Sequence, residues 1–355
     1  MNLKTKDGIT LIALAVTIVV MLILAGVTTS VLTGESGIIT KAKKAKVQSV
    51  KAGIKEIISL ENNQFTMEEL EGEVVEKDYN EKIDQIWKKI QDEGLTKKGI
   101  VVERKKNIVV INNEIVIPLY TLEDAVQADD TLMEMGIRQI DGDRNNDVAT
   151  IAGYKGTEEK VVIPDYYVKD KKIYPVTIIN QPWTGNRFYG NTNIKEIVMN
   201  NNIEIIEAWA FGNMTNLESI KLSIQISSIP DGVFNNCKNL KEITIPDKVT
   251  TIGNNTFQFC TSLERIEIPS SVKEIGELAF GYVGNNGTTY MGTEYKGKLK
   301  QIILNEGLEK IGKEAFTWAD TVSYDLTIPT TVTTIGERAF DRFGFDGGGK
   351  LYNNK

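Results

Sequence analysis

The sequence predicts an α/β protein in three parts: an apolar N-terminal helix, a small α/β module and a solenoid built from stacked repeats. Two observations indicate this organisation. An uncharged, apolar stretch from Ile9 to Val27 follows a short polar beginning. Farther along, phenylalanine recurs with a period of about 23 residues, and a fixed period is typical of repeats that bury one another's apolar faces. The series comprises Phe211, Phe234, Phe257 and Phe280, extended by Phe188, Phe316 and Phe340.

Each predicted repeat carries further apolar positions in register with the phenylalanine. An L-x-x-I-x-I segment alternates apolar and polar residues, which predicts a strand with one buried face. Pro246, Pro269 and Pro329 follow it directly and end the strand, because proline cannot donate to a strand ladder. The repeat's tail, such as Ile275 to Phe280, predicts a short helical turn or irregular bend. The registered positions are Ile194, Leu217, Leu240, Leu263 and Leu299, then Ile197, Ile220, Ile243, Ile266 and Ile302, then Ile206, Ile229, Ile252, Ile275, Ile311 and Ile335.

The residues between the buried positions of these strands form a candidate binding face. Their mixed charges and few aromatic side chains are typical of an ordinary solvated face more than of a binding hot spot, which favours Trp, Tyr and Arg. The candidate residues are Glu196, Lys221, Glu242, Thr244, Arg265, Glu267, Gln301, Asp325 and Thr327.

The repeated segment resembles a known family. The stretch from Ile229 to Phe280, which contains LKEITIPDKVTTIGNNTF, resembles the BspA-like leucine-rich repeats of bacterial surface proteins. The piece from Ile151 to Pro164 resembles the way such arrays begin. This resemblance implies a leucine-rich repeat array over residues 151–343 that has no enzymatic activity and no cofactor. It also implies display outside the cell and a role in adhesion or in binding a protein or glycan.

Composition narrows the classes of function. The chain has 355 residues, a formal net charge of −7 and an isoelectric point near 5.1. The chain is acidic, and nucleic-acid binding needs clustered Lys and Arg to contact phosphates. No DNA- or RNA-binding motif appears either, so DNA and RNA are not expected as partners. The absence of histidine removes the commonest general base and every Ser-His or Cys-His arrangement. We therefore do not expect an enzyme.

Two cysteines, Cys237 and Cys260, occupy the same place in successive repeats. Equivalent places hold Met214, Val283 and Ala319, all apolar, which favours buried thiols. The alternative is a disulfide between adjacent repeats, although parallel Cβ vectors fit disulfide geometry poorly.

The apolar stretch Ile9 to Val27 is long enough to cross a bilayer as a helix, since ~19 residues at ~1.5 Å each reach about 28 Å. Lys4 and Lys6 before it favour a cytoplasmic amino terminus. Lysines 41, 43, 44 and 46 beyond it oppose translocation, but large domains cross membranes despite such charge. A cleaved secretory signal, a plain membrane anchor and a prepilin leader all remain open.

The junction KDGITLIALAVTIVV resembles the type IV prepilin leader. On this resemblance residues 1–8 form the leader, Gly8 is its last residue, and Ile9 becomes the methylated amino terminus after cleavage by a prepilin peptidase. The family usually has Phe at the first position and Glu at the fifth, where this chain has Ile9 and Ala13. The missing Glu puts assembly into a pilus in doubt. We rank the pilin-like leader first, the anchor second and the cleaved signal third.

The residues after the apolar stretch predict that its helix continues as an amphipathic helix, followed by a small α/β module. Residues 9–60 comprise the apolar helix and its amphipathic continuation, Ile38 to Leu60, and residues 61–150 form an α/β head or spacer. Within this module Tyr79 to Glu93 has helical spacing. The strands 108–111 and 114–117 flank Asn112 and Asn113, which tolerate the positive φ of a tight hairpin.

Three segments carry weaker signals. Asp141, Asp143, Asn145 and Asp147 alternate as calcium ligands do, but the Gly at position six and the Glu at position twelve are missing, which favours a polar turn. The insertion 281–298 interrupts the repeats, and insertions in repeat arrays often carry a binding site. The alternative, a surface hairpin without a binding role and with Asn285–Gly287 as its turn, is slightly favoured. Residues 344–355 form a tail without an obvious capping repeat.

The sequence thus supports two hypotheses. The first is a surface-displayed adhesion or interaction protein, fixed in the bacterial cell membrane or a cell-surface pilus by its N-terminal helix. The second is a structural pseudopilin or spacer subunit of a type IV pilus or type II secretion-like assembly, without an external ligand.

Overall fold

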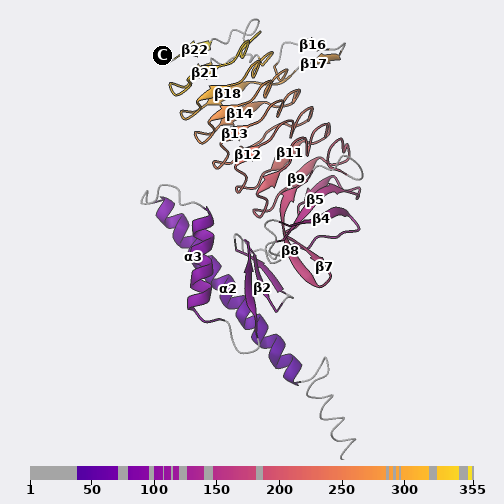
Figure 1. Cartoon of the computed structure of the whole chain (residues 1–355), viewed down its shortest axis with the longest axis vertical. Coiled ribbons are helices and arrows are strands. Elements are labelled where there is room, and N and C mark those ends of the chain that lie inside the picture. Colours follow the sequence, from indigo (N-terminus) through magenta and orange to yellow (C-terminus); the bar gives the residue numbers. More distant parts are fainter. Residues whose placement is uncertain are drawn as a thin grey trace, which may run out of the picture. The chain divides into compact units, whose positions relative to one another are not determined.

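The computed structural model describes residues 38–70, 79–95, 100–106, 108–112, 115–119, 126–139, 147–180, 187–284, 288–290, 293–295, 297–319, 326–343 and 351–353 (Figure 1). The predicted leader, with Gly8 and Ile9, and the apolar stretch to Val27 lie outside these residues. Within the described part of the chain, no helix has both the length and the apolar character needed to cross a membrane. The chain divides into two compact units, residues 1–103 with 110–117 and residues 104–109 with 118–355.

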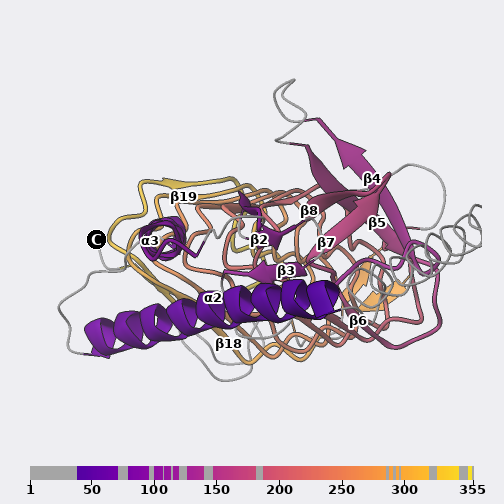
Figure 2. The same ribbon diagram turned by 90° about the horizontal axis from the view of Figure 1, so that it is seen from below.

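The first unit contains two helices. Helix α2 runs from Ile38 to Leu70 as one continuous helix (Figure 2), and α3 runs from Tyr79 to Asp92. Both bury an apolar stripe at helical spacing. The two helices are joined by an ion pair between Lys89 and Glu61. The stripes consist of Val50, Ile54 and Ile58 in α2 and Ile83, Ile86 and Ile90 in α3. Helix α3 was predicted nearly to the residue, whereas the predicted boundary at 60/61 falls inside α2.

Three short strands follow: β1 (Val102–Lys105), β2 (Ile108–Ile111) and β3 (Ile115–Pro118), in the order β1-β2-β3. Asn112 adopts a φ of 52° after β2, as the hairpin prediction required. Its backbone N–H donates to the Val101 carbonyl at 2.8 Å, and its side-chain oxygen accepts from the Val101 N–H at 2.8 Å. Asparagine suits this place because a side chain that bonds the local backbone offsets the cost of a left-handed conformation.

The second unit begins with a mixed sheet in the order β10-β8-β5-β4, in which β7 also pairs with β8. Strand β5 is buried along its whole length and lies between antiparallel β4 and parallel β8. The predicted boundary at 150/151 therefore falls inside β5, and strand β4 belongs to the unit that contains the repeats. The strands are β4 (Met133–Arg138), β5 (Val148–Tyr154), β7 (Tyr166–Lys169), β8 (Lys172–Ile179) and β10 (Ile205–Ile206).

The repeats stack as rungs, and the L-x-x-I-x-I segments form parallel strands along one side. These strands pair as β6-β9-β11, β14-β18 and β20-β22. Their side chains alternate between buried and solvent-facing positions, as Arg265–Ile268 shows. The strands are β6 (Lys160–Val162), β9 (Glu196–Val198), β11 (Ser219–Lys221), β14 (Arg265–Ile268), β18 (Gln301–Leu304), β20 (Leu326–Ile328) and β22 (Leu351–Asn353).

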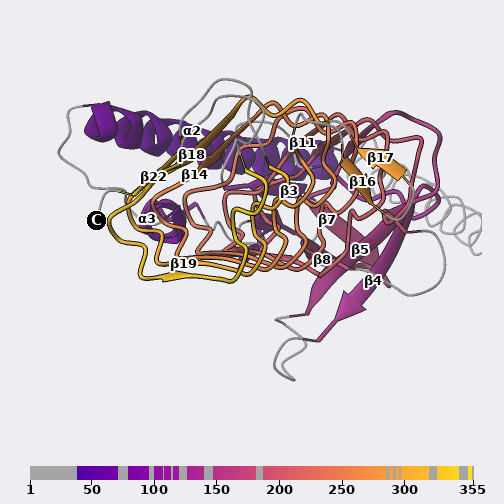
Figure 3. The same ribbon diagram turned by 90° about the horizontal axis from the view of Figure 1, so that it is seen from above.

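A second parallel sheet, which the sequence analysis did not predict, runs along the other side of the rungs (Figure 3). Its strands are very short, and each contributes one of the registered isoleucines. The two residues of each strand are followed by a turn, as at 277–280, so the prediction of a short turn or bend holds for the rest of the segment. The strands are β12 (Ser228–Ile229), β13 (Thr251–Ile252), β15 (Glu274–Ile275), β19 (Lys310–Ile311) and β21 (Thr334–Ile335).

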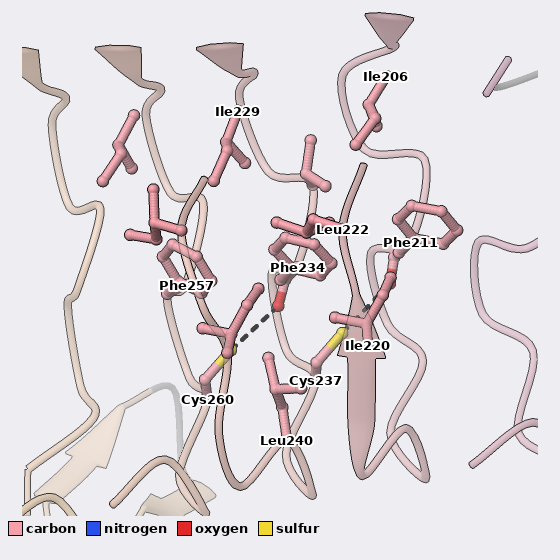
Figure 4. Packing of buried hydrophobic residues seen from close by; sticks show 14 of the residues in the cluster. Ile206, Phe211, Ile220, Leu222, Ile229, Phe234, Cys237, Leu240, Phe257 and Cys260 are labelled. Atoms are coloured by element: carbon pink, nitrogen blue, oxygen red, sulfur yellow. Dashed lines mark hydrogen bonds between the residues drawn. The ribbon is translucent and has the colours of Figure 1, made fainter. Parts of the chain in front are cut away.

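The predicted phenylalanine column lies between these two sheets and continues from Phe188 to Phe340. Figure 4 shows its members Phe211, Phe234 and Phe257. Neighbouring ring centroids are 5.1 to 5.9 Å apart. From Phe211 onward the planes of neighbouring rings in the column are within 18° of parallel. All but Phe340 are fully buried. Each ring thus forms part of the core of the next rung, and this contact fixes the register between repeats.

The cysteines lie beside this column as buried free thiols, so the alternative of a disulfide is wrong. The Sγ of Cys237 donates to the Phe211 carbonyl at 3.2 Å, and that of Cys260 donates to the Phe234 carbonyl at 3.1 Å (Figure 4). Burial raises the pKa of Cys237 to about 12 and raises the pKa of Cys260 well above its usual value. Both residues act as small apolar side chains of the core.

The insertion 281–298 contains an antiparallel hairpin of β16 (Thr288–Tyr290) and β17 (Thr293–Tyr295). The chain reverses between Tyr290 and Thr293, so the prediction that Asn285–Gly287 forms the turn is wrong. The predicted tail carries β22, which pairs in parallel with β20 through Leu326 and Leu351. A strand of the tail therefore adds to the first side of the rungs.

Candidate interaction surfaces

Most of the predicted binding face lies side by side in the structure. Glu196, Ser219 and Glu242 are partners in successive rungs, and Arg265 is the partner of Gln301. Glu196 and Gln301 are half-buried. Asp325 lies outside the described residues. The exposed members are Lys221, Glu242, Thr244, Arg265, Glu267 and Thr327.

Ion pairs satisfy much of the charge on this face. Lys160 contacts Glu196 at 2.7 Å, and Arg265 contacts Glu267 at 2.9 Å within one strand. The Asn305 side chain also donates to Glu267 at 3.4 Å. A ligand that used these charges would first have to displace their present partners, and exposed pairs of this kind contribute little energy by themselves.

A column of alternating charge precedes the strands. Lys195 contacts Glu159 at 2.7 Å and Lys300 contacts Glu264 at 2.5 Å. The hydrogen bond from Lys300 lowers the pKa of Glu264, and the bond to Glu159 raises the pKa of Lys195. Each charge in the column lies beside an opposite charge in the adjacent rung, which favours the observed stacking. If a rung packed instead on the rung after its neighbour, like charges would meet. The full column is Glu159, Lys195, Glu218, Lys241, Glu264 and Lys300.

The sequence analysis missed a second strip, formed two positions after each core phenylalanine. This position has positive φ in every described rung, from 52° to 74°. The first three rungs use the residue types that tolerate such a conformation, and the last four do not. The strip, which we call the tail-edge column, consists of Gly190, Asn213, Asn236, Phe259, Tyr282, Trp318 and Arg342.

Side chains of the tail-edge column contact one another in three pairs of neighbouring rungs. The Asn236 amide donates to the Asn213 amide oxygen at 2.7 Å. The rings of Phe259 and Tyr282 stack with centroids 5.0 Å apart, and the Arg342 guanidinium lies 4.6 Å from the Trp318 ring centroid. These contacts offset part of the strain, because a stacked aromatic or cation–π pair contributes roughly 0.5–1.5 kcal/mol. The aromatic side chains of the column are only half-buried, so part of each one faces solvent.

Two positions in the last part of each repeat adopt a left-handed backbone conformation, and the hydrogen bonds between rungs explain why. Wherever the structure describes them, the positions two before and two after the phenylalanine both adopt positive φ, as Asn255 and Phe259 do at 54° and 63°. This bend turns alternate N–H groups toward the next rung. The resulting hydrogen bonds join Asn255 to Glu277, Phe257 to Ala279 and Phe259 to Gly281, at 2.8, 2.7 and 3.0 Å.

The metal prediction is only partly covered by the structure. Asp141, Asp143 and Asn145 lie outside the described residues, and Asp147 precedes β5 with one buried side-chain oxygen that has no hydrogen-bond partner in the described structure. Among the described residues, no group of three or more His, Cys, Asp or Glu side chains could hold a metal ion. The polar turn that the sequence favours here, and the calcium loop that is its alternative, therefore both stay predictions.

Parallel strands that recur with columns of Leu, Ile and Phe define a leucine-rich-repeat type of fold with mixed α/β content. The family described as BspA type leucine rich repeat region matches residues 184–296 and 292–345, in six copies. No curated protein matches the chain. The match covers the stacked rungs and agrees with the family resemblance of the repeats.

Solved structures with leucine-rich repeats are similar to part of the chain. A leucine-rich repeat protein from Bacteroides ovatus is 21% identical over 59% of this chain and 49% of its own, with a TM-score of 0.48. The T. pallidum leucine-rich repeat protein is 22% identical over 59% and 81%, with a TM-score of 0.44. A leucine-rich cell surface protein from Faecalibacterium prausnitzii is 26% identical over 60% and 51%, with a TM-score of 0.47. The chain thus spans about half the length of the first and third of these proteins.

Proposed function

We propose that this chain is a non-enzymatic cell-surface interaction protein that binds a protein or a glycan with its repeat array. The observation that carries the proposal is the array itself, in which successive rungs present two solvent-facing strips: the predicted binding face, which we call the strand face, and the tail-edge column. The match to BspA type repeats supports it. Repeat arrays use such extended surfaces for recognition.

The proposal includes fixation to the bacterial cell membrane, or to a cell-surface pilus, through the segment that begins at Ile9. The length and apolar character of this segment support membrane insertion. Mass spectrometry of the mature amino terminus tests the three modes. A chain that begins at methylated Ile9 supports the pilin-like leader, one that begins at Met1 supports the anchor, and one that begins beyond Ala25 supports a cleaved signal.

Within the array, the tail-edge column is the stronger contact surface. Trp, Tyr and Arg dominate binding hot spots, and the column supplies Tyr282, Trp318 and Arg342. The backbone N–H groups of Tyr282 and Trp318 donate to carbonyls of the next rung at 2.9 and 3.0 Å. The strand face instead supplies the ion-paired Arg265 and Glu267. We therefore expect the tail-edge column to contribute most of the affinity for a ligand.

Binding of the full chain to cells and to glycan arrays tests this function. The first variant is Tyr282→Asn with Trp318→Asn, which gives the column the residue type of Asn213 and Asn236 and preserves the backbone. The matched control is Arg265→Gln with Glu267→Gln, which leaves the net charge unchanged. Loss of binding in the first variant alone supports the assignment. Failure of the unmodified chain to bind any cell or glycan contradicts the function.

The second candidate is a structural spacer, a pseudopilin of a type IV pilus or type II secretion-like assembly without an external ligand. The ion-paired strand face favours it, because charges that pair within the chain are not available to a ligand. A spacer would associate with its own kind or with pilus subunits. Sedimentation that shows concentration-dependent self-association, together with no binding to cells, supports this second function over the first.

A further inference from the structure

The amino-terminal half of helix α2 carries a dense cluster of positive charge. Between Ile38 and Lys55 the helix has several lysines and no acidic residue, although the whole chain has a net charge of −7. The first acidic side chain of the helix is Glu56. The helix is thus divided into a basic first half and a second half that contains acidic residues. The lysines are Lys41, Lys43, Lys44, Lys46, Lys51 and Lys55.

The first turns of this helix do not pack as the later turns do. All residues from Lys41 to Lys46 are exposed, and the buried apolar stripe begins only at Val50. Lys41, Lys43 and Lys44 form no ion pair with other described residues. At about 100° per residue, the lysines of this segment are distributed around the helix, so that any flat surface beside it meets some of them.

We propose that residues 41–46, which we call the basic collar, bind the phosphate groups of anionic lipids at the surface of the membrane that holds the chain. This inference rests on the proposed membrane anchoring. Two observations favour a lipid headgroup as the occupant. The collar begins at Lys41, close in sequence to Val27, the end of the apolar stretch, so the connecting chain limits its distance from the membrane to at most ~50 Å. Lysine beside a bilayer is attracted by anionic headgroups with about 1 kcal/mol per residue.

The net charge of the chain makes the collar testable. An acidic protein is repelled by an anionic vesicle as a whole, so any preference for anionic over neutral lipid must come from a local basic site. Apolar insertion of residues 9–27 does not discriminate between the two lipids. The ratio of the partition coefficients for the two vesicles therefore measures the basic groups beside the bilayer, which include Lys4 and Lys6. The part of the ratio that is lost when only the collar lysines are replaced measures the collar.

The experiment uses the full chain and two kinds of vesicle, phosphatidylcholine alone and phosphatidylcholine with one third phosphatidylglycerol. The variant carries Lys41→Gln, Lys43→Gln, Lys44→Gln and Lys46→Gln. The matched control carries Lys88→Gln, Lys169→Gln, Lys172→Gln and Lys298→Gln, which removes the same charge from exposed positions elsewhere. Flotation at low salt and at 1 M salt, where the Debye length is about 3 Å, measures the partition ratio.

We expect the unmodified chain and the control to prefer the anionic vesicle at low salt, and the collar variant to lose about tenfold or more of that preference. High salt should remove the preference in every form. Equal ratios for the unmodified chain and the collar variant overturn the proposal, as does an equal loss in the control. Absence of uptake by either vesicle instead contradicts membrane anchoring, so failure of the collar and failure of the anchor give different results.

Discussion

The rings of Phe257 and Phe280 lie 5.1 Å apart and 11° from parallel, although they belong to successive repeats of the sequence. Both are completely buried. We expect Phe257→Ala to lower the free energy of unfolding by about 3–5 kcal/mol, because it removes a buried ring and leaves a cavity between two rungs. Urea unfolding followed by circular dichroism measures the change.

The control for this prediction lies two positions away. Phe259 is half-buried and stands at a φ of 63°, so Phe259→Asn loses less apolar contact and relieves backbone strain. We expect its effect to be less than half that of Phe257→Ala. Equal effects of the two substitutions would show that the column at Phe257 does not hold the rungs together.

Glu314 provides a test of the strain in the tails. It adopts a φ of 52°, a conformation that costs a residue with a Cβ roughly 1–2 kcal/mol unless it is Asn or Asp. We expect Glu314→Asn to raise the free energy of unfolding by about 1 kcal/mol. Glu314→Ala is the control, since it removes the same charge but keeps the strain. A gain in stability from the alanine variant that matched the gain from asparagine would contradict a conformational cause.

The apolar columns could be predicted from the sequence because each repeat shows the same residues at the same spacing. Ile220 and Ile266 lie buried in strands, as predicted. The second sheet could not be predicted, because strands as short as Thr251–Ile252 cannot show an alternation. The partners of β5 were also hidden, since β6 and β7 lie between β5 and β8 in the sequence and no local pattern indicates a distant pairing.

The backbone conformation of the tail-edge column could be predicted from the sequence only in part. Asn213 and Asn236 indicate positive φ by their residue type, and the repeat alignment could have carried this expectation to Phe259 and Tyr282. Aromatic residues at those positions instead suggest a core, because side-chain type gives no sign of a left-handed backbone when the residue is not Gly or Asn. The strained positions were thus the ones where local preference and the fold disagree.

Asp165 predicts an unusual dependence of stability on pH. Its side chain is 4% exposed and accepts a hydrogen bond from the Val126 N–H at 2.7 Å, and burial raises its pKa from 3.8 to about 6. Since the folded state binds this proton more tightly than the unfolded state, the contribution of Asp165 to stability is full below pH 3.8 and is lost as the pH rises through 6.

The variant Asp165→Asn keeps an acceptor for Val126 and removes the charge. We expect it to stabilise the chain at pH 8 by up to about 3 kcal/mol, because the charged carboxylate is no longer buried, and to have little effect at pH 3.5. Asp129→Asn is the control, because hydrogen bonds from Thr131 lower the pKa of Asp129. Removing the Asp129 charge should therefore destabilise the chain at pH 8. A stabilisation by Asp165→Asn that did not vary with pH would contradict the titration.

The buried thiols lead to the last prediction. At pH 8 a thiol with a pKa of about 12, as burial gives Cys237, is almost entirely protonated, and it is also shielded from reagents. We expect iodoacetamide to modify neither cysteine in the folded chain and both after unfolding in urea without a reductant, as intact mass shows. A Thr244→Cys variant, exposed on the strand face, should gain one rapid modification when folded. If the unfolded, unreduced chain remained unmodified, Cys237 and Cys260 would be joined by a disulfide and the packing of the thiols against Phe211 and Phe234 would be wrong.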